Sequence, residues 1–551
     1  MSTTKAEPPS VRAGRLQRSV GFYGLMMVSL GSIIGSGWLL GALNAAERAG
    51  PASVLSWILA AGMLSLLALV YAELGATYPV AGGGARFPYY SHGAIAGFTA
   101  GWASWLQAVF IAPLEVLAAI TYVNSVGWIN QHFNMIYKVG EKAGLLNGTG
   151  LLVALVLMVV FTAMNLAGAK FVSDSNVIVV IWKTAVPVLA VGVVAAMQFN
   201  PSNFHAGGGF MPFGFHGVFA ALTGGVVFGL QGFEQAVHLA GEARDPKRDL
   251  SRAILVAMTI GAVLYALLQI VMIGALDPAH IAKGWSMPLG TDPSDYGVWY
   301  TLALALGAGW LAKVLLIDAV ISPAGTGVVY MATTARLSYA LGEEREMPSA
   351  LATTSKGVPV VSILTAAVVG TAAFGPFKSW NALVSVVTAA TAIMYSFAPL
   401  SLAALHKLDR DRPRSYRVPM PKVALPAAFC SANLIMYWGG FDTNWKLALA
   451  MLAGLALFAI GAFRMRTRAW SALRNAIWMG PWLSGHLLLG WLGRYGGGQN
   501  ILPNWVDIGV VIAFALAIFY WATALRLSEE NSAAAVAKDA QQIDYEAAPQ
   551  G

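Results

Sequence analysis

Three ionisable side chains lie in stretches of the sequence that are otherwise apolar: Glu115, Lys183 and Asp318. An intramembrane lysine costs about 2.5–3.5 kcal/mol on insertion scales, and ionisable groups at that depth are usually functional. Burial disfavours the charged form of acids and amines, so Lys183 could be a reversible proton site and Glu115 a proton carrier or recognition group. The alternatives are a permanent structural ion pair for Lys183 and a buried, hydrogen-bonded carboxyl for Glu115.

Asp318 is followed at helical spacing by two hydroxyl residues, Ser322 and Thr326. Positions i, i+4 and i+8 fall on one face of an α-helix, and that face could partner Lys183. The alternative is that Asp318 pairs only with Lys313, although five residues is a poor spacing for contact on a helix face. The first arrangement would place a carboxyl and two hydroxyls beside the lysine.

Glycines interrupt the run from Gly24 to Gly41, which is apolar enough to cross a bilayer. Each interior glycine costs a helix about 0.5–1 kcal/mol relative to alanine. Freed backbone groups are tolerated at membrane depth only where they face protein, water or a ligand. We therefore predict a helix broken at Gly35-Ser36-Gly37, with partly positive N–H groups that bind an anionic group. The alternative is a small-residue packing face between helices.

A second interruption of the same kind occurs within Thr223 to Glu234, where glycines again accompany polar residues. It falls in the sixth apolar segment, so the broken helices would be the first members of two five-helix halves. Because five is odd, the second half would cross the membrane in the opposite direction. Matching interruptions are typical of inverted repeats with a binding site at the membrane midplane. The alternative is two unrelated glycine packing faces.

The composition indicates that transmembrane helices position these groups. The chain has 551 residues, of which 57% are hydrophobic and 11% charged, and its mean hydropathy is +0.64. No soluble class fits these values, so we predict an all-α polytopic membrane protein. The apolar segments predict about fourteen transmembrane helices, near 23–43, 53–74, 95–126, 150–169, 175–197, 215–240, 252–276, 298–335, 358–376, 380–405, 423–441, 446–463, 475–493 and 504–525.

These segments predict five regions: a cytoplasmic N-terminal tail (1–22), a first repeat (23–197), a second repeat (215–405), peripheral helices (423–525) and a disordered cytoplasmic C-terminal tail (526–551). The polar stretch from Met1 to Ser19 lacks an apolar core and a small-residue cleavage site, so we expect no removable signal peptide. Lys and Arg are in excess in the loops on the side of both termini, which predicts that this side is cytoplasmic. The most basic loop, 406–422, is interpreted as a solvated cytoplasmic loop, with contact to anionic lipids as the alternative.

Several classes of function are excluded by composition. The net charge of +8 could suggest nucleic acid, but the basic residues lie in loops rather than on one soluble face, so we predict no nucleic-acid partner. The single cysteine, Cys430, rules out an internal disulfide and a thiolate metal cluster. No metalloprotease helix, nucleophile elbow or phosphate loop occurs, so we predict neither an enzyme nor a cofactor or metal.

Several motifs carry a family resemblance across residues 20–530. They are Gly31 to Trp38, Tyr71 to Pro79 with the glycines that follow, and Gly241 to Arg248. The sequence resembles the amino acid–polyamine–organocation superfamily, and Ser379-Trp380-Asn381 is among the pieces similar to its bacterial aspartate–proton symporter branch. The resemblance implies a 5+5 inverted-repeat (LeuT-like) transporter core with helices 1 and 6 broken.

The resemblance also implies roles for residues at the two breaks. Amides of the first broken helix would bind the substrate carboxylate, and carbonyls of the second would bind its ammonium, while Phe228 or Phe233 closes over it unless either is simply core. Glu115 could recognise the substrate side chain. The expected substrate-binding residues are Ser32, Gly35, Ser36, Gly37, Glu115, Phe228, Gly229, Gln231, Gly232 and Phe233.

In proton-coupled members of the superfamily, a lysine that looks equivalent to Lys183 occupies the place of a bound sodium ion. Its ammonium would supply the positive charge that the sodium ion supplies in other members. Loss of its proton would loosen the junction between helices one, five and eight. The expected proton-coupling residues are Lys183, Asp318, Ser322, Thr326 and Glu115.

The predicted function is a proton-coupled amino acid symporter of the cell membrane that imports aspartate or glutamate by alternating access. Its partners would be the amino acid, protons and the lipid bilayer, and the sequence does not define an oligomeric state. The nearest alternative is a permease or exchanger for neutral or cationic amino acids or amines. A channel, a membrane enzyme and a non-transporting nutrient sensor are the alternatives of a different kind.

Overall fold

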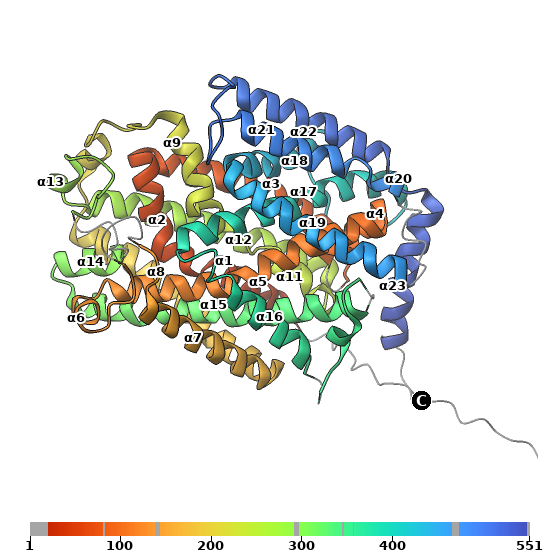
Figure 1. Cartoon of the computed structure of the whole chain (residues 1–551), viewed down its shortest axis with the longest axis horizontal. Helices are drawn as coiled ribbons and strands as arrows, with labels where there is room; N and C mark the ends of the chain where they lie inside the picture. Colours follow the sequence, from red (N-terminus) through yellow and green to blue (C-terminus); the bar gives the residue numbers. More distant parts are fainter. Residues whose placement is uncertain are drawn as a thin grey trace, which may run out of the picture.

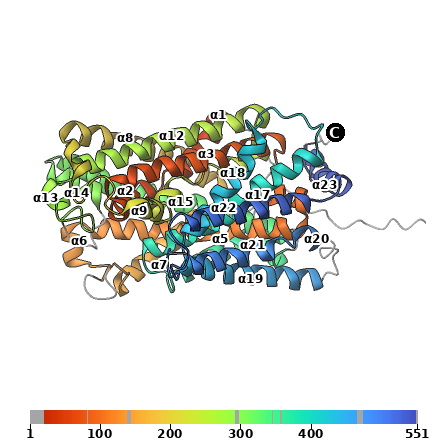
Figure 2. The same cartoon turned by 90° about the horizontal axis from the view of Figure 1, so that it is seen from above.

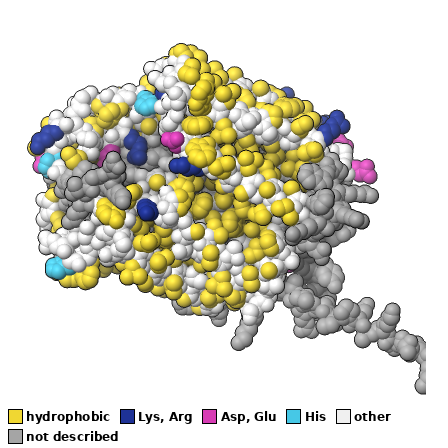
Figure 3. Space-filling model, viewed as in Figure 1, with side chains coloured by type: hydrophobic (Ala, Val, Ile, Leu, Met, Phe, Trp, Pro, Cys, Tyr) yellow, Lys and Arg dark blue, Asp and Glu magenta, His cyan; other side chains and the backbone are white. Residues whose placement is uncertain are grey.

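The computed structural model describes residues 20–80, 83–137, 144–290, 297–343, 346–355, 358–464 and 473–547. Within these ranges the regular secondary structure is helical, and strand pairing is limited to isolated bridges. Nine of the described helices are long and apolar enough to cross a membrane. On the face shown in Figure 3, hydrophobic side chains cover most of the surface and charged ones are few. The chain is therefore an all-α, multi-pass membrane protein.

The first part of the chain forms α1 (Phe22–Ile33), α2 (Ser36–Ala49), α3 (Ser53–Thr77), α4 (Gly83–His92), α5 (Ala94–Asn124), α6 (Gly127–His132), α7 (Gly148–Leu166) and α8 (Ala169–Met197). The middle part forms α9 (Gly214–Ala221), a π-helical turn (Leu222–Val226), α10 (Val227–Leu230), α11 (Gln235–His238), α12 (Pro246–Ala275), α13 (Pro278–Ile281), α14 (Val298–Ala305) and α15 (Gly309–Glu343).

The last part forms α16 (Val360–Ala372), α17 (Trp380–Leu408), α18 (Pro421–Trp438), α19 (Phe441–Arg464), α20 (Leu473–Ala476), α21 (Met479–Leu492), α22 (Val506–Ala524) and α23 (Glu529–Ala547). Every apolar segment expected from the sequence overlaps helix in the structure. The number of membrane crossings, fourteen, and the inverted-repeat arrangement stay predictions.

The helices run mostly along the long axis of the molecule (Figures 1 and 2). At one end lie α6, α13 and α14, and at the other lie α20 and α23. We refer to these ends as the α13 side and the α23 side. The central helices α5 and α15 pack along each other, and α17 packs against α5. These three helices surround the middle of the bundle together with α1, α2 and α10.

Both predicted helix interruptions are present. Between α1 and α2, Ile34 is extended and Gly35 is non-helical, so α2 begins at Ser36. The carbonyl freed at Ile33 accepts a hydrogen bond from the Tyr265 hydroxyl at 3.0 Å. In the second interruption, Gln231 is extended and helix resumes only at Gln235. There the Phe233 carbonyl accepts a hydrogen bond from Ser29 Oγ at 2.8 Å.

Glycines bring the two interruptions into direct contact. A Cβ added to Gly37 would lie 2.7 Å from the Cα of Gly229, so the backbones of α2 and α10 touch. Gly232 has φ +109, and a Cβ there would lie 2.8 Å from the backbone of Ser32. A side chain at either glycine would separate the two broken helices. The glycines therefore agree with both interpretations made from the sequence, because they permit close packing of the helices and lie at the helix interruptions.

Two regions differ from the expectation. The apolar segment 298–335 is divided into α14 and α15 because the chain turns at Gly307, where φ is +75. The C-terminal tail expected to be disordered contains α23 over residues 529–547. That helix is stabilised where it packs on α4, with Ser532 buried and the Leu527 N–H bonded to the Ser91 carbonyl at 2.9 Å. Residues 1–19 of the predicted N-terminal tail lie outside the described residues.

Candidate functional site

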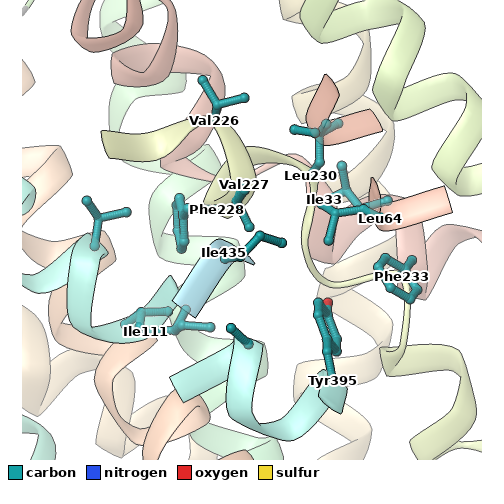
Figure 4. Packing of buried hydrophobic residues seen from close by; sticks show 14 of the residues in the cluster. Ile33, Leu64, Ile111, Val226, Val227, Phe228, Leu230, Phe233, Tyr395 and Ile435 are labelled. Carbon is teal, nitrogen blue, oxygen red and sulfur yellow. The ribbon is translucent and has the colours of Figure 1, made fainter. Parts of the chain in front are cut away.

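A small cavity lies where the two helix interruptions face α5 and α15. On one side of the second interruption, Phe228 lies near Ile111 of α5, and on the other side Phe233 lies beside Tyr395 (Figure 4). The lining combines apolar walls with several polar groups and one carboxyl. The lining residues are Ser32, Ile33, Gly35, Ile111, Glu115, Phe228, Gln231, Thr326 and Tyr330.

The first broken helix points a backbone donor at a carboxylate of the protein itself. The N–H of Ser36, the first residue of α2, donates to Glu115 Oε2 at 3.0 Å. The other oxygen, Oε1, lies 2.8 Å from the position of a Cβ added to Gly35 and has no hydrogen-bond partner. Helix N-termini favour anions because their N–H groups are unpaired and carry partial positive charge. Glu115 therefore occupies the kind of anion site that the sequence predicted for a ligand.

Lys183 lies next to this carboxylate. Its side chain is 1% exposed, and its ammonium donates to Thr326 Oγ1 at 2.7 Å. The charges of both Glu115 and Asp318 act on the ammonium. A Cβ added to Gly35 would lie 3.0 Å from the same Thr326 hydroxyl, so the lysine reaches the cavity through one shared group. The lysine of α8 is thus connected to the interruption of the first helix.

The predicted face of α15 is buried and partly paired. Ser322 Oγ donates to Asp318 Oδ1 at 2.8 Å. Lys313, the alternative partner, is exposed. The same face continues for one more turn to Tyr330, which lines the cavity. Tyr330 continues the four-residue spacing of Asp318, Ser322 and Thr326, but it was not predicted as a site residue from the sequence.

An aromatic pair covers the cavity towards the α13 side. Trp380 of α17 packs against Phe228 with ring centroids 5.9 Å apart and nearly perpendicular planes. Its indole N–H donates to Ser36 Oγ at 3.1 Å. The lid therefore joins α17, the second interruption and the start of α2. Sequence reasoning placed Trp380 in a family-like motif without giving it a role, because nothing local to the motif connects it with Ser36.

Phe233 belongs to the opposite closure rather than to the cavity lining. It stacks on Tyr395 at 5.3 Å and contacts the edge of Tyr71 at 6.0 Å. The Tyr395 hydroxyl donates to Glu234 Oε2 at 2.7 Å, and that oxygen also accepts the Gly232 N–H at 3.0 Å. The residues after the second interruption are thereby fixed to α17 and α3 on the α23 side of the cavity.

A buried ionic contact lies further towards the α23 side. Glu73 at the end of α3 is fully buried and pairs with His406 at 2.6 Å and with Arg414 at 3.2 Å. Its other oxygen accepts the Val418 N–H at 2.7 Å. The Arg414 side chain is only 4% exposed, so the basic loop is anchored on the bundle instead of being fully solvated as expected. The reason is that Glu73 offers a buried carboxylate that the loop must pair.

The predicted substrate-binding residues converge on the interruptions to different degrees. Ser32, Gly35, Glu115, Phe228 and Gln231 line the cavity, whereas Phe233 lies outside it. The remaining predicted positions contribute through the backbone. Ser36 donates its N–H to Glu115, and the close approaches of the two broken helices occur at Gly37, Gly229 and Gly232.

Known proteins resemble this chain over most of its length. A model of the amino acid permease family matches residues 20–459. The glutamate/serine transporter AimA of Bacillus subtilis is 33% identical over 514 residues, which cover 92% of this chain and 94% of that protein. The aspartate-proton symporter of the same organism is 32% identical over 517 residues, covering 93% and 97%. The branched-chain amino acid permease BcaP of Bacillus subtilis is 26% identical, covering 80% and 92%.

The chain belongs to the amino acid permease family, within the amino acid–polyamine–organocation superfamily. The resemblance inferred from the sequence motifs is therefore confirmed. The family and the named relatives are membrane transporters, so the prediction that this chain is a transporter rather than an enzyme is confirmed too.

Proposed function

We propose that the protein is a proton-coupled symporter that imports an acidic amino acid, aspartate or glutamate, through the cell membrane. The observation that carries the proposal is the contact between the Ser36 N–H and Glu115, with Lys183 close by. The N–H groups at the start of α2 suit a substrate carboxylate, but a carboxylate of the protein holds one of them. A substrate must displace Glu115 to use that donor.

Protonation of Glu115 would allow the substrate to displace it from the Ser36 N–H. A neutral carboxyl is a weaker acceptor than a carboxylate, because charged hydrogen bonds are about twice as strong as neutral ones. A proton on Glu115 would therefore free the Ser36 amide for the substrate and remove a negative charge from the cavity. Lys183 would exchange the proton and adjust the junction between α1, α8 and α15 through Thr326. Binding of substrate and of proton would thus favour each other.

Alternating access would follow from the closures on the two sides of the cavity. Release of the Trp380 contact with Ser36 would open the α13 side, and release of the contacts at Phe233 and Glu73 would open the α23 side. We propose that the α23 side faces the cytoplasm, because the loops there carry the excess of Lys and Arg. The two broken helices would then belong to oppositely oriented repeats.

The acidic substrate is supported by the relatives that match most of the chain. Two of them are named for glutamate and serine transport and for aspartate–proton symport. A permease or exchanger for neutral amino acids is the alternative, and a relative named as a branched-chain amino acid permease supports it.

Transport in proteoliposomes tests the proposal. Purified protein would be reconstituted at equal internal and external sodium, and uptake of labelled aspartate measured with and without an imposed inward proton gradient. We expect the gradient to drive accumulation, a protonophore to abolish it, and unlabelled glutamate to compete while lysine does not. Accumulation that requires sodium and ignores the proton gradient would overturn the coupling. Competition by branched-chain amino acids but not by glutamate would favour the alternative, a permease or exchanger for neutral amino acids.

A further inference from the structure

The exposed face of α12 changes from basic to apolar along the helix. Arg248 and Arg252, about one turn apart, are exposed near its start. Exposed apolar side chains continue the same face at spacings of three or four residues: Val256, Ile260, Val263 and Leu267. We call these four residues the α12 stripe. Residues at this spacing share one side of a helix, so two cations stand at the head of about three turns of apolar surface.

The length of α12 places the two arginines at the level of lipid headgroups. The helix has 30 residues, so it is about 45 Å long, whereas the hydrocarbon core of a bilayer is about 30 Å thick. The start of the helix therefore extends beyond the hydrocarbon. The α12 stripe rises about 17 Å, which is close to the apolar thickness of one leaflet. An acyl chain lying along the stripe would have its headgroup beside Arg248 and Arg252.

The 406–422 loop brings further cations to the same place. Ser415 Oγ donates to the carbonyl of Lys247, in the first turn of α12, at 2.5 Å. Arg417 follows Ser415 by two residues, so the Cα atoms of these two residues lie within about 8 Å of each other. Lys247 and Arg417 are both exposed. Two segments that are 168 residues apart at this contact thus present cations side by side.

These cations lack anionic partners in the protein. Across the described parts of the chain, no ion pair or side-chain hydrogen bond involves Lys247, Arg248, Arg252 or Arg417. In the same loop, by contrast, Arg414 is paired with Glu73. Asp245 and Asp249 lie in the same turn of α12 as Arg248, but two carboxylates do not balance four cations. The surface therefore keeps a positive charge that an anion outside the protein can neutralise.

We propose that Arg248, Arg252 and Arg417 bind the headgroup of an anionic phospholipid in the leaflet on the α23 side, with an acyl chain along the α12 stripe. Arginine suits a phosphate because its planar guanidinium donates two parallel hydrogen bonds. Clusters of cations at the membrane surface select anionic lipids over zwitterionic ones, which carry no net charge. The site lies outside the cavity between the helix interruptions and goes beyond the proposed transport function.

Lipid binding to purified, delipidated protein tests the proposal with no amino acid present. Dissociation constants for phosphatidylglycerol and phosphatidylcholine would be measured by native mass spectrometry. We expect the wild type to bind phosphatidylglycerol at least about tenfold more tightly, since each cation near an anionic lipid contributes about a fivefold gain. The double variant Arg248→Gln/Arg252→Gln should weaken phosphatidylglycerol binding by about 5- to 25-fold and leave phosphatidylcholine within about twofold.

A matched control removes the same charge elsewhere. Lys283 and Lys313 are exposed on the α13 side, and Lys283→Gln/Lys313→Gln should keep the full preference for phosphatidylglycerol. Equal affinity of the wild type for both lipids, or an equal loss in the two double variants, would overturn the proposal. Monodisperse elution establishes that each variant is folded. Should Arg248→Gln/Arg252→Gln fail this criterion, Arg417→Gln replaces it, with an expected loss of about fivefold.

A soluble headgroup separates a lipid site from a general anion site. Glycerophosphoglycerol has the headgroup of phosphatidylglycerol without acyl chains. It should displace the lipid only at a concentration at least about 100-fold higher, because the acyl chain contributes apolar contact along the α12 stripe. Displacement at a concentration equal to that of the lipid would overturn the assignment to a phospholipid. None of these outcomes depends on amino acid transport, which the proteoliposome assay tests separately.

Discussion

The N–H of Ser36 donates to Glu115 Oε2 at 3.0 Å, so the first residue after the helix interruption is held by a carboxylate from α5. Ser36 and Glu115 are 79 residues apart in the chain. The interruption of the first helix therefore forms an anion site, and the carboxylate of Glu115 already occupies it. In the proposed mechanism, a substrate carboxylate and Glu115 would compete for the same donor, and protonation of Glu115 would decide the competition.

The contact between the broken helices gives the first prediction. Gly37→Ala should lower the transport rate by at least about tenfold, since a Cβ there would meet the Gly229 Cα at 2.7 Å and overpacking costs about 1–3 kcal/mol. Uptake by cells with matched expression is the measurement. Gly62→Ala on α3 is the control, because a Cβ at that position meets nothing within 4 Å. Full transport by Gly37→Ala would show that α2 and α10 need no such proximity.

Lys183 gives the second prediction. Lys183→Ala removes the ammonium that donates to Thr326, so proton-driven accumulation should fall to background while exchange of internal for external substrate persists. Counterflow and gradient-driven uptake would be measured in the same vesicles. Lys313→Ala, an exposed lysine of α15, should retain both activities. Gradient-driven accumulation at the wild-type level in Lys183→Ala would remove the lysine from the mechanism.

The Trp380 lid gives the third prediction. Trp380→Phe keeps an aromatic ring against Phe228 but loses the donor to Ser36 Oγ. A lost hydrogen bond of about 0.5–1.5 kcal/mol corresponds to a two- to tenfold larger population open on the α13 side. A cysteine at Ile111 in the cavity, in a chain with Cys430 replaced, should be labelled faster from outside by the same factor. The exposed Trp310 provides the control variant Trp310→Phe.

Labelling of the Ile111 cysteine at an unchanged rate would mean that Trp380 does not limit access. The orientation of the bundle is tested in the same experiment, since the reagent must reach the cavity from the α13 side. Faster labelling only from the α23 side would reverse the proposed orientation.

His92 gives a prediction on stability against pH. Burial lowers the pKa of His92 to about 4, against about 6.5 in an unfolded chain. The unfolded state therefore binds more protons between these values, so the histidine lowers stability as the pH falls below 6.5. At pH 5 the cost is about 2 kcal/mol, and the melting temperature of detergent-solubilised protein should fall less from pH 7 to 5 in His92→Gln than in wild type. His132 is exposed, so His132→Gln should behave as wild type. An equal fall in melting temperature from pH 7 to 5 in the wild type, His92→Gln and His132→Gln would contradict the prediction.

Local sequence patterns were sufficient for part of the fold. Glycines within apolar runs indicated the interruptions before Ser36 and after Leu230, since a broken helix needs residues that tolerate non-helical backbone. Lys183 and Glu115 stood out because ionisable groups are rare at membrane depth. The face of Asp318, Ser322 and Thr326 followed from helical spacing alone.

The remaining features depend on contacts between distant parts of the chain. Trp380 covers the cavity through Ser36, and Glu73 holds the 406–422 loop, but no local pattern encodes either pairing. Phe233 and Phe228 are five residues apart and looked equivalent in the sequence. The extended backbone at Gln231 separates them into the α23-side closure and the cavity lining.

Substrate-linked proton movement tests the central claim most directly. Vesicles containing purified protein and a trapped pH indicator would receive aspartate at equal pH and sodium on both sides, with the membrane potential clamped. The account predicts that the lumen acidifies as labelled aspartate enters, and that Glu115→Gln abolishes the acidification while the amino acid still exchanges. Entry of aspartate without any change in luminal pH, in wild type as in Glu115→Gln, would contradict it.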